Sequence, residues 1–211
     1  MEQKYMITDE RKNVILDRVE HTVHRIKAIR DFGYIRSGDI GGWIECDINL
    51  SHDGLCWVDD NAVVVGTSMV LENARVTENA TVYGDCKILG NSTIYGYSKV
   101  TWNAVVCGSS SIGGDAQIGI NAYIRSKDDY VTISPLQMSN DVVHELGDSI
   151  TFYRTEQNKI MVNSLYYNCS IDDYRYIILR EYCEYVGDSE MTKIRNTYLT
   201  AIEFASNKFK I

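Results

Sequence analysis

Side chains that could act as bases, nucleophiles or metal ligands are few in this 211-residue chain, and they are widely spaced. The four histidines are His21, His24, His52 and His144, and the six cysteines form no C-x-x-C pair. His21 and His24 are three residues apart, which on a strand places them on opposite faces. Because zinc sites need clustered thiolate and imidazole ligands, we expect no metal, and no motif indicates a cofactor.

A second group of chemically able side chains lies in the C-terminal third, where tyrosines are unusually dense. Tyr153, Arg154, Tyr166 and Tyr167 lie on or beside expected strands, and further tyrosines follow on an expected helix. Tyrosine is favoured at interfaces, and arginine makes directional, permanently charged contacts. We predict that these four residues contribute to binding. The structural alternative for Arg154 is an ion pair with a carboxylate of the same region.

The middle of the chain, which must position any site, repeats every six residues. Val or Ile recurs without a break, a small residue follows four positions later, and Gly-Asn or Gly-Asp pairs are frequent between them. β-Branched residues suit strands and Gly-Asn suits corners, so three hexads predict one triangular coil of a β-helix. The inward residues of about four coils are Val58, Val64, Val70, Val76, Val82, Ile88, Ile94, Val100, Val106, Ile112, Ile118 and Ile124.

Residues on either side of each inward Val or Ile point outward, and every third hexad returns to the same side of the prism. One side presents Thr81, Lys99 and Gln117 among others. Another side is mainly apolar, with Met69, Leu71, Leu89, Val105, Cys107 and Tyr123. Contiguous apolar surface of this extent is normally covered. We therefore predict that this side is an interface, covered by a second copy of the chain or by its own C-terminal part.

The flanks of the repeats predict three domains, 1–57, 58–127 and 128–211. The first is a cap of strands and turns, with a polar turn at 9–13, that closes the open end of the coils through Trp43 and Trp57. The third is a small α+β unit. Its expected elements are strands at 131–133, 149–154 and 160–162, a helix capped by Ser170 and ending near 186, and a helix at 189–207.

Charge and hydropathy limit the possible partners. The formal net charge is −8, which argues against direct nucleic-acid or membrane binding. The N-terminus has no apolar signal segment, and no stretch of about 20 apolar residues occurs elsewhere. We expect a cytoplasmic protein with reduced thiols.

The V-x-G-N-A-x hexads resemble those of hexapeptide-repeat proteins, which implies a left-handed parallel β-helix and, often, association of subunits through prism faces. A wider set of segments also resembles a family of phage and prophage β-helix proteins. These are GGWIE at 41–45, LSHDGLCWVDDNA at 50–62, ITFYRTEQNKIMV at 150–162 and YLTAIEFA at 198–205. This second resemblance implies a viral or mobile-element origin, and hence the host cytoplasm, more than it implies an activity.

Catalysis on this fold usually depends on histidine. Hexapeptide-repeat acyltransferases use a His general base, and the γ-class carbonic anhydrases use three His ligands, but no His lies between Val58 and Ile124. We therefore expect no catalytic residue. The leading hypothesis is a non-catalytic, phage-type binding or inhibitor protein that engages a host protein or a small nucleotide-like ligand, for example in counter-defence. The alternative is a hexapeptide-repeat acyltransferase-like enzyme.

Overall fold

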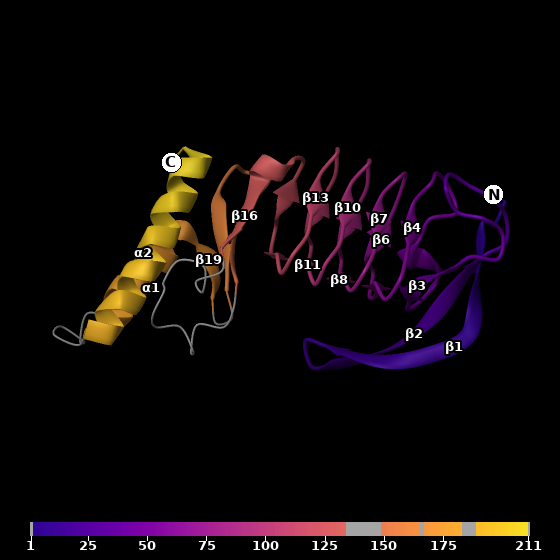
Figure 1. Cartoon of the computed structure of the whole chain (residues 1–211), viewed down its shortest axis with the longest axis horizontal. Coiled ribbons are helices and arrows are strands. Elements are labelled where there is room, and N and C mark those ends of the chain that lie inside the picture. Colours follow the sequence, from indigo (N-terminus) through magenta and orange to yellow (C-terminus); the bar gives the residue numbers. More distant parts are fainter. Residues whose placement is uncertain (1, 134–148, 165–166, 183–188, 211) are drawn as a thin grey trace.

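The chain forms an elongated row of three parts in a computed structural model that describes residues 2–133, 149–164, 167–182 and 189–210. Figure 1 shows a long N-terminal hairpin, a stack of β coils in the centre, and a C-terminal sheet with two helices beside it. The mainly β architecture, with parallel coils followed by an α+β unit, confirms the predicted fold class.

The coils consist of very short parallel strands, stacked into one sheet on each side of the prism. Strands pair at a spacing of 18 residues, as Lys99 does with Thr81 and with Gln117. The first face comprises β3 (Ile40–Ile44), β5 (Val63–Val64), β8 (Thr81–Gly84), β11 (Lys99–Trp102) and β14 (Gln117–Ile118); the second comprises β4 (Trp57–Val58), β7 (Arg75–Val76), β10 (Thr93–Ile94) and β13 (Ser111–Ile112); the third comprises β6 (Met69–Val70), β9 (Lys87–Ile88), β12 (Val105–Val106) and β15 (Tyr123–Ile124).

The interior of the stack is filled by the predicted column of Val and Ile. All of these side chains, from Val58 to Ile124, have no solvent exposure. The small residues of the hexads are also buried, and serines among them pair locally: the Ser92 hydroxyl donates to the Leu89 carbonyl at 2.7 Å. The six-residue register is therefore confirmed, and the core of the stack is mainly apolar.

The corners bring successive coils so close together that there is no room for most side chains. Gly90 has a φ of 74°, and a Cβ added there would lie 2.5 Å from the carbonyl oxygen of Gly108. Trp102 occupies the same corner position one coil after Gly84, with which it pairs, and it also has a positive φ. Trp102 is 56% exposed. A bulky residue is uncommon in this conformation, so Trp102 is an unusual surface feature of the coils.

The stack has about five coils, because one coil precedes those that the hexads predict. β3 pairs in parallel with β5, and after the short 3₁₀ turn η1 (Asp47–Asn49), Leu50 bridges to Val70. Ile44 and Leu50 keep the six-residue spacing and are fully buried. The next inward residue is Val58, so two extra residues in the turn around Gly54 break the phase and hide this coil in the sequence.

The N-terminal part is a long antiparallel hairpin, β1 (Tyr5–Leu16) and β2 (Val19–Ala28), which extends the first face beyond β3. Its turn is at Asp17 and Arg18, both with positive φ, so the polar turn predicted at 9–13 is wrong. That segment is strand, with a register shift between Ile7 and Arg11 that absorbs its irregularity. The tip reaches the coils, because the Tyr83 hydroxyl donates to the Asp17 carboxylate at 3.3 Å.

Aromatic residues close the N-terminal end, as predicted, but the two tryptophans do different things. Trp57 is fully buried and packs edge-on against Phe32 and Tyr5, with ring centroids 5.4 and 6.3 Å away. Trp43 lies instead beneath the hairpin, where the cationic groups of Lys12 and Arg25 lie 4.2 and 4.3 Å from its ring.

The C-terminal unit packs against the last coil. After the 3₁₀ turn η2 (Lys127–Asp129) come the antiparallel strands β16 (Tyr130–Ile133), β17 (Ile150–Arg154), β18 (Ile160–Asn163) and β19 (Asn168–Ser170), then α1 (Ile171–Glu181) and α2 (Ser189–Phe209). The three predicted strands and two predicted helices are present, but α1 ends at Glu181 rather than near 186, and β19 is additional. Ser170 caps α1, accepting the Asp173 N–H at 3.1 Å. The division into three domains stays a prediction.

Candidate functional site

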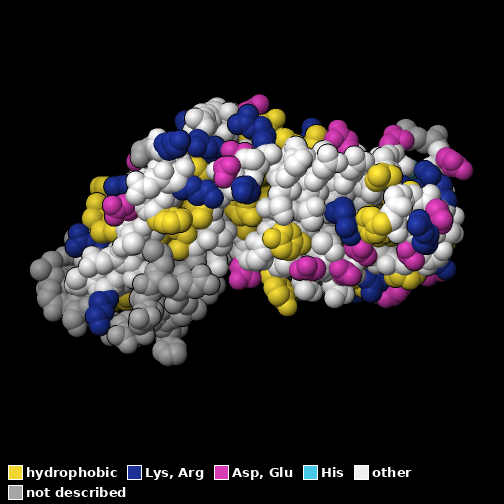
Figure 2. Space-filling model, turned by 45° about the horizontal axis from the view of Figure 1, so that its top comes forward, with side chains coloured by type: hydrophobic (Ala, Val, Ile, Leu, Met, Phe, Trp, Pro, Cys, Tyr) yellow, Lys and Arg dark blue, Asp and Glu magenta, His cyan; other side chains and the backbone are white. Residues whose placement is uncertain are grey.

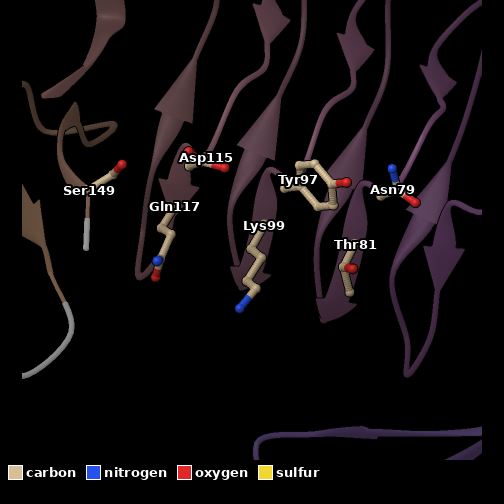
Figure 3. Close-up of a pocket in the computed structure, with 7 residues that line it drawn as sticks. All are labelled: Asn79, Thr81, Tyr97, Lys99, Asp115, Gln117 and Ser149. Atoms are coloured by element: carbon tan, nitrogen blue, oxygen red, sulfur yellow. The ribbon is translucent and has the colours of Figure 1, made fainter. Parts of the chain in front are cut away.

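A groove of about 560 Å³ lies on the coil stack and is lined by two columns of polar side chains. In Figure 3, the column at the corner consists of Asn79, Tyr97 and Asp115, and the column on the first face consists of Thr81, Lys99 and Gln117. Ser149, just before β17, lines the end of the groove. Neighbouring coils are about 4.8 Å apart, so the side chains form a regularly spaced grid.

The backbone beneath the groove is fixed by the coil hydrogen bonds. The Tyr97 N–H donates to the Gly114 carbonyl at 2.8 Å, and the Lys99 N–H donates to the Ala116 carbonyl at 2.8 Å. Val100, next to Lys99, is fully buried in the prism. Because each inward residue anchors its outward neighbour, the groove side chains project from a rigid floor.

Opposite charges are available in the groove. Among its lining residues, Lys99 is the cation and Asp115 the anion, and both are exposed. Within the described parts of the chain, no ion pair or side-chain hydrogen bond occupies either of them. Tyr97 adds an aromatic ring that is 68% exposed. A free carboxylate can accept a proton or hold a cation, and a free ammonium group can stabilise an oxyanion.

The hairpin brings one histidine to the first face. His21, on β2, has its Nδ1 3.0 Å from Oε1 of Glu45, and Oε2 of Glu45 accepts the Gly66 N–H at 2.7 Å. Burial raises the pKa of Glu45, but the Gly66 amide and His21 outweigh it and hold that pKa below 4.5. An imidazole oriented by a carboxylate is a geometry that general bases use. The absence of His from the hexads therefore does not keep imidazole away from the coils.

The other described histidines, His24 and His52, do not form a site. His52 belongs to the N-terminal plug, where its ring stacks on Tyr5 at 4.3 Å and its Nδ1 accepts the Lys4 N–H at 3.3 Å. His24 lies on β2 opposite Ile44, and His144 is outside the described residues. Within the described ranges, no three His, Cys, Asp or Glu side chains come together as metal ligands.

The predicted binding residues of the C-terminal part lie in separate surroundings. Tyr153 is fully buried and plugs the end of the coils, so its side chain is not at the surface. Arg154 lies 3.7 Å from Asp129 and donates to the Phe209 carbonyl at 3.2 Å, which is the ion-pair alternative. Tyr167 hydrogen-bonds to Glu181, and Tyr166 is outside the described residues. Binding by these residues stays a prediction.

The predicted apolar interface corresponds to the third face. Its residues Met69, Leu71, Leu89, Val105, Cys107 and Tyr123 are all half-buried. The described part of the C-terminal unit contacts the last coil mainly through β17 and η2. Cover by a second copy of the chain or by its own C-terminal part stays a prediction.

The surface and the helices add two observations. Figure 2 shows charged side chains of both signs interspersed with separate hydrophobic patches, rather than one field of a single sign. Neither of the described helices is long and apolar enough to span a membrane.

None of the groove residues was singled out by sequence reasoning. Sorting outward residues by face does place Thr81, Lys99 and Gln117 together, and their pairing in the ladder confirms it. The corner column escapes that sorting, because Asn79 and Asp115 occupy hexad positions that look like ordinary turn residues. A period of 18 residues, applied to the corners as well as the strands, is the signal that would find it.

Comparison with known proteins gives a distant relative. No family model matches the chain. Over 67 residues the chain is 34% identical to a protein of Escherichia coli K12 named "Uncharacterized acetyltransferase YdcK". The match covers 31% of this chain, which spans only 18% of the length of that protein. Together with the coils, this similarity supports a β-helix repeat protein.

The comparison corrects the functional expectation. The hypothesis of a non-catalytic, phage-type binding or inhibitor protein is contradicted, because the relative is named as an acetyltransferase. The expectation that the chain is not an enzyme is contradicted by the same finding, and nothing in the comparison supports a phage origin. The argument from missing coil histidines failed because it considered only the hexads, whereas other polar groups also line the coil surface.

Proposed function

We propose that the chain is a hexapeptide-repeat acyltransferase-like enzyme whose groove binds the acceptor of the acyl group. The observation that carries the proposal is the similarity of a β-coil protein to a protein named as an acetyltransferase. The groove supports it, since about 560 Å³ is within the usual range for a small-molecule site. The free cysteines of the described chain fit the reducing cytoplasm in which we expect it to act.

The chemistry requires a base, an oxyanion stabiliser and a rigid floor. An acceptor hydroxyl or amine attacks the carbonyl carbon of an acyl-carrier thioester, its proton passes to a base, and the carbon–sulfur bond breaks to release the thiol. In the groove, Asp115 is the carboxylate that takes the proton, and Lys99 is the cation that stabilises the oxygen of the tetrahedral intermediate. Both project from neighbouring coils, so the floor keeps their separation fixed.

His21 offers a second base outside the groove lining. Its contact with Glu45 leaves Nε2 as the ring nitrogen that could take a proton. The groove is the better site because both charged groups lie in one pocket, whereas His21 lies at the hairpin. The two assignments are separable by mutation.

The test is release of free thiol from acetyl-CoA by the purified chain, supplied with a panel of small amines and alcohols. Asp115→Asn and Lys99→Ala should each lower the rate by about 10²-fold. The matched control is Lys87→Ala, because Lys87 precedes an inward residue in the same way but lies on the third face. It should leave the rate unchanged.

Two results would overturn the assignment. Acyl transfer itself is contradicted if acetyl-CoA releases no thiol with any acceptor and causes no thermal shift. A rate lost in His21→Gln but retained in Asp115→Asn would keep the function and move the base to the hairpin.

A further inference from the structure

A lysine and a cysteine are buried against each other in the N-terminal plug, away from the groove. Lys4 and Cys56 both have no solvent exposure, and the Lys4 Nζ lies 3.2 Å from the Cys56 Sγ. The residues come from the start of the chain and from the turn that precedes β4, 52 positions apart. Nothing in the proposed acyl transfer uses either of them.

The surroundings of the amine are unusual for a buried lysine. Nζ donates to the carbonyl oxygens of Cys56 at 2.9 Å and Asp53 at 3.3 Å, and it lies 5.0 Å from the centre of the Phe32 ring. Within the described residues no carboxylate is in ion-pair distance of this amine. A buried ammonium group without such a partner is costly. Burial accordingly lowers the pKa of Lys4, which favours the neutral, nucleophilic amine.

The thiol lies in matching surroundings. Burial raises the pKa of Cys56, whereas the nearby Lys4 opposes that rise and so favours the thiolate, the form that reacts with peroxides. A separation of 3.2 Å is within the range from which positioned groups react. The turn over the pair is thin, since residues 53–55 are exposed, so a small opening of this turn gives a small oxidant access.

We propose that Lys4 and Cys56 are a modification site at which a peroxide forms a covalent sulfur–nitrogen bond between the two side chains. In the first step the Cys56 sulfur bonds to one oxygen of the peroxide and the oxygen–oxygen bond breaks. Cys56 becomes a sulfenic acid, and from hydrogen peroxide the other oxygen leaves with the thiol proton as one water. In the second step the Lys4 nitrogen attacks that sulfur. The sulfur–oxygen bond breaks, and the hydroxyl leaves with a proton from the nitrogen as a second water. The resulting sulfenamide links Lys4, just before β1, to Cys56, just before β4.

The chain contains a matched control. Cys86 occupies the same small position of its hexad and is also fully buried, but its Sγ contacts the carbonyl oxygens of Tyr83 and Trp102 at 3.4 and 3.6 Å instead of an amine. Burial raises its pKa to about 12. One oxidation experiment therefore compares two buried thiols, Cys56 beside a lysine and Cys86 without one.

The test treats the full chain with hydrogen peroxide and maps the products by intact mass and peptide mass spectrometry. The expected result is a species lighter by two hydrogen atoms in which the peptides of Lys4 and Cys56 are joined, and a thiol reductant restores the original mass. Cys86→Ala should form the same link, whereas Cys56→Ala, which places the commonest small residue of the hexads, should not.

The proposal is wrong if Cys56 is recovered unlinked, as a thiol or as a sulfinic or sulfonic acid, under conditions that oxidise the exposed Cys46. It is also wrong if the mass loss persists in Cys56→Ala. Both readouts are independent of acyl transfer, so failure of one proposal leaves the other intact.

Discussion

The two ends of the coil stack are closed in different ways, although both present unpaired strand edges that must be covered. At the N-terminal end Trp57, Phe32 and Tyr5 gather around the axis, from segments far apart in the sequence. At the C-terminal end one tyrosine, Tyr153 of β17, enters the core, and its hydroxyl donates to the Asn168 side chain at 3.2 Å.

The difference indicates what each plug depends on. The N-terminal plug fills a wide opening with aromatic volume, so its stability should follow buried apolar area. The C-terminal plug is positioned by a sheet, and a Cβ on Gly119 of the last coil would lie 3.2 Å from the Tyr153 hydroxyl and 3.0 Å from the Asn168 amide nitrogen. At this end, close packing and hydrogen bonds hold the single ring of Tyr153 in place.

The largest expected effect is on the N-terminal plug. Trp57→Ala should lower the free energy of unfolding by roughly 3–5 kcal/mol, through lost burial and the cavity it leaves. Urea melts followed by circular dichroism measure it. The control is Trp102→Ala, which removes a ring that is 56% exposed and should cost less than about 1 kcal/mol. Equal losses in the two variants would contradict a plug built on aromatic volume.

The middle of the stack needs no plug and should respond less. Ile94→Ala removes a fully buried side chain that coils on both sides enclose, at an expected cost of roughly 2–4 kcal/mol. The same melts measure it. A loss below about 1 kcal/mol would show that the coil interior tolerates cavities that its close packing should not allow.

The third face gives a smaller effect that appears in assembly rather than folding. If a second copy covers this face, Leu89→Asp should weaken association by about 1–3 kcal/mol per subunit, through lost apolar burial and an unpaired charge. Light scattering would then detect a smaller particle with an unchanged melting temperature. Leu179→Asp, on α1, is the control. An unchanged particle size in Leu89→Asp would contradict the predicted interface at Leu89.

The coil interior could be predicted residue by residue, because one inward position recurs every six residues and is occupied by Val or Ile each time from Val58 to Ile124. The coil around Leu50 was missed, because two inserted residues shift the phase while the backbone pairing continues to Val70. The ends and the groove are set by contacts between distant segments. No local pattern records that Tyr153 turns inward or that Asp115 and Lys99 share one pocket.

The hydroxyl of the C-terminal plug should contribute modestly. Tyr153→Phe keeps the ring in the core and removes the donor to Asn168, at an expected cost of about 1 kcal/mol. Thermal melts of Tyr153→Phe and Trp57→Phe compare the loss of stability from one removed hydroxyl with that from one smaller ring. A loss above about 3 kcal/mol for Tyr153→Phe would mean that hydrogen bonding, more than volume, closes the C-terminal end.

The smallest expected effect on stability concerns the N-terminal hairpin, which extends the sheet of the first face. The pKa of Glu45 is held below 4.5 in the folded chain, so its charge stabilises the fold at pH above that value. The contribution is lost as the pH falls through the lower, folded-state pKa. The difference in unfolding free energy between wild type and Glu45→Gln should be about 0.5 kcal/mol near neutral pH, because the side chain is partly exposed. It should shrink in acid.

Glu72→Gln is the control, since Glu72 accepts the Gly90 N–H at 2.8 Å in the same corner geometry without a histidine partner. A difference for Glu45→Gln that stays constant down to strong acid would show that the contact with His21 does not stabilise the hairpin.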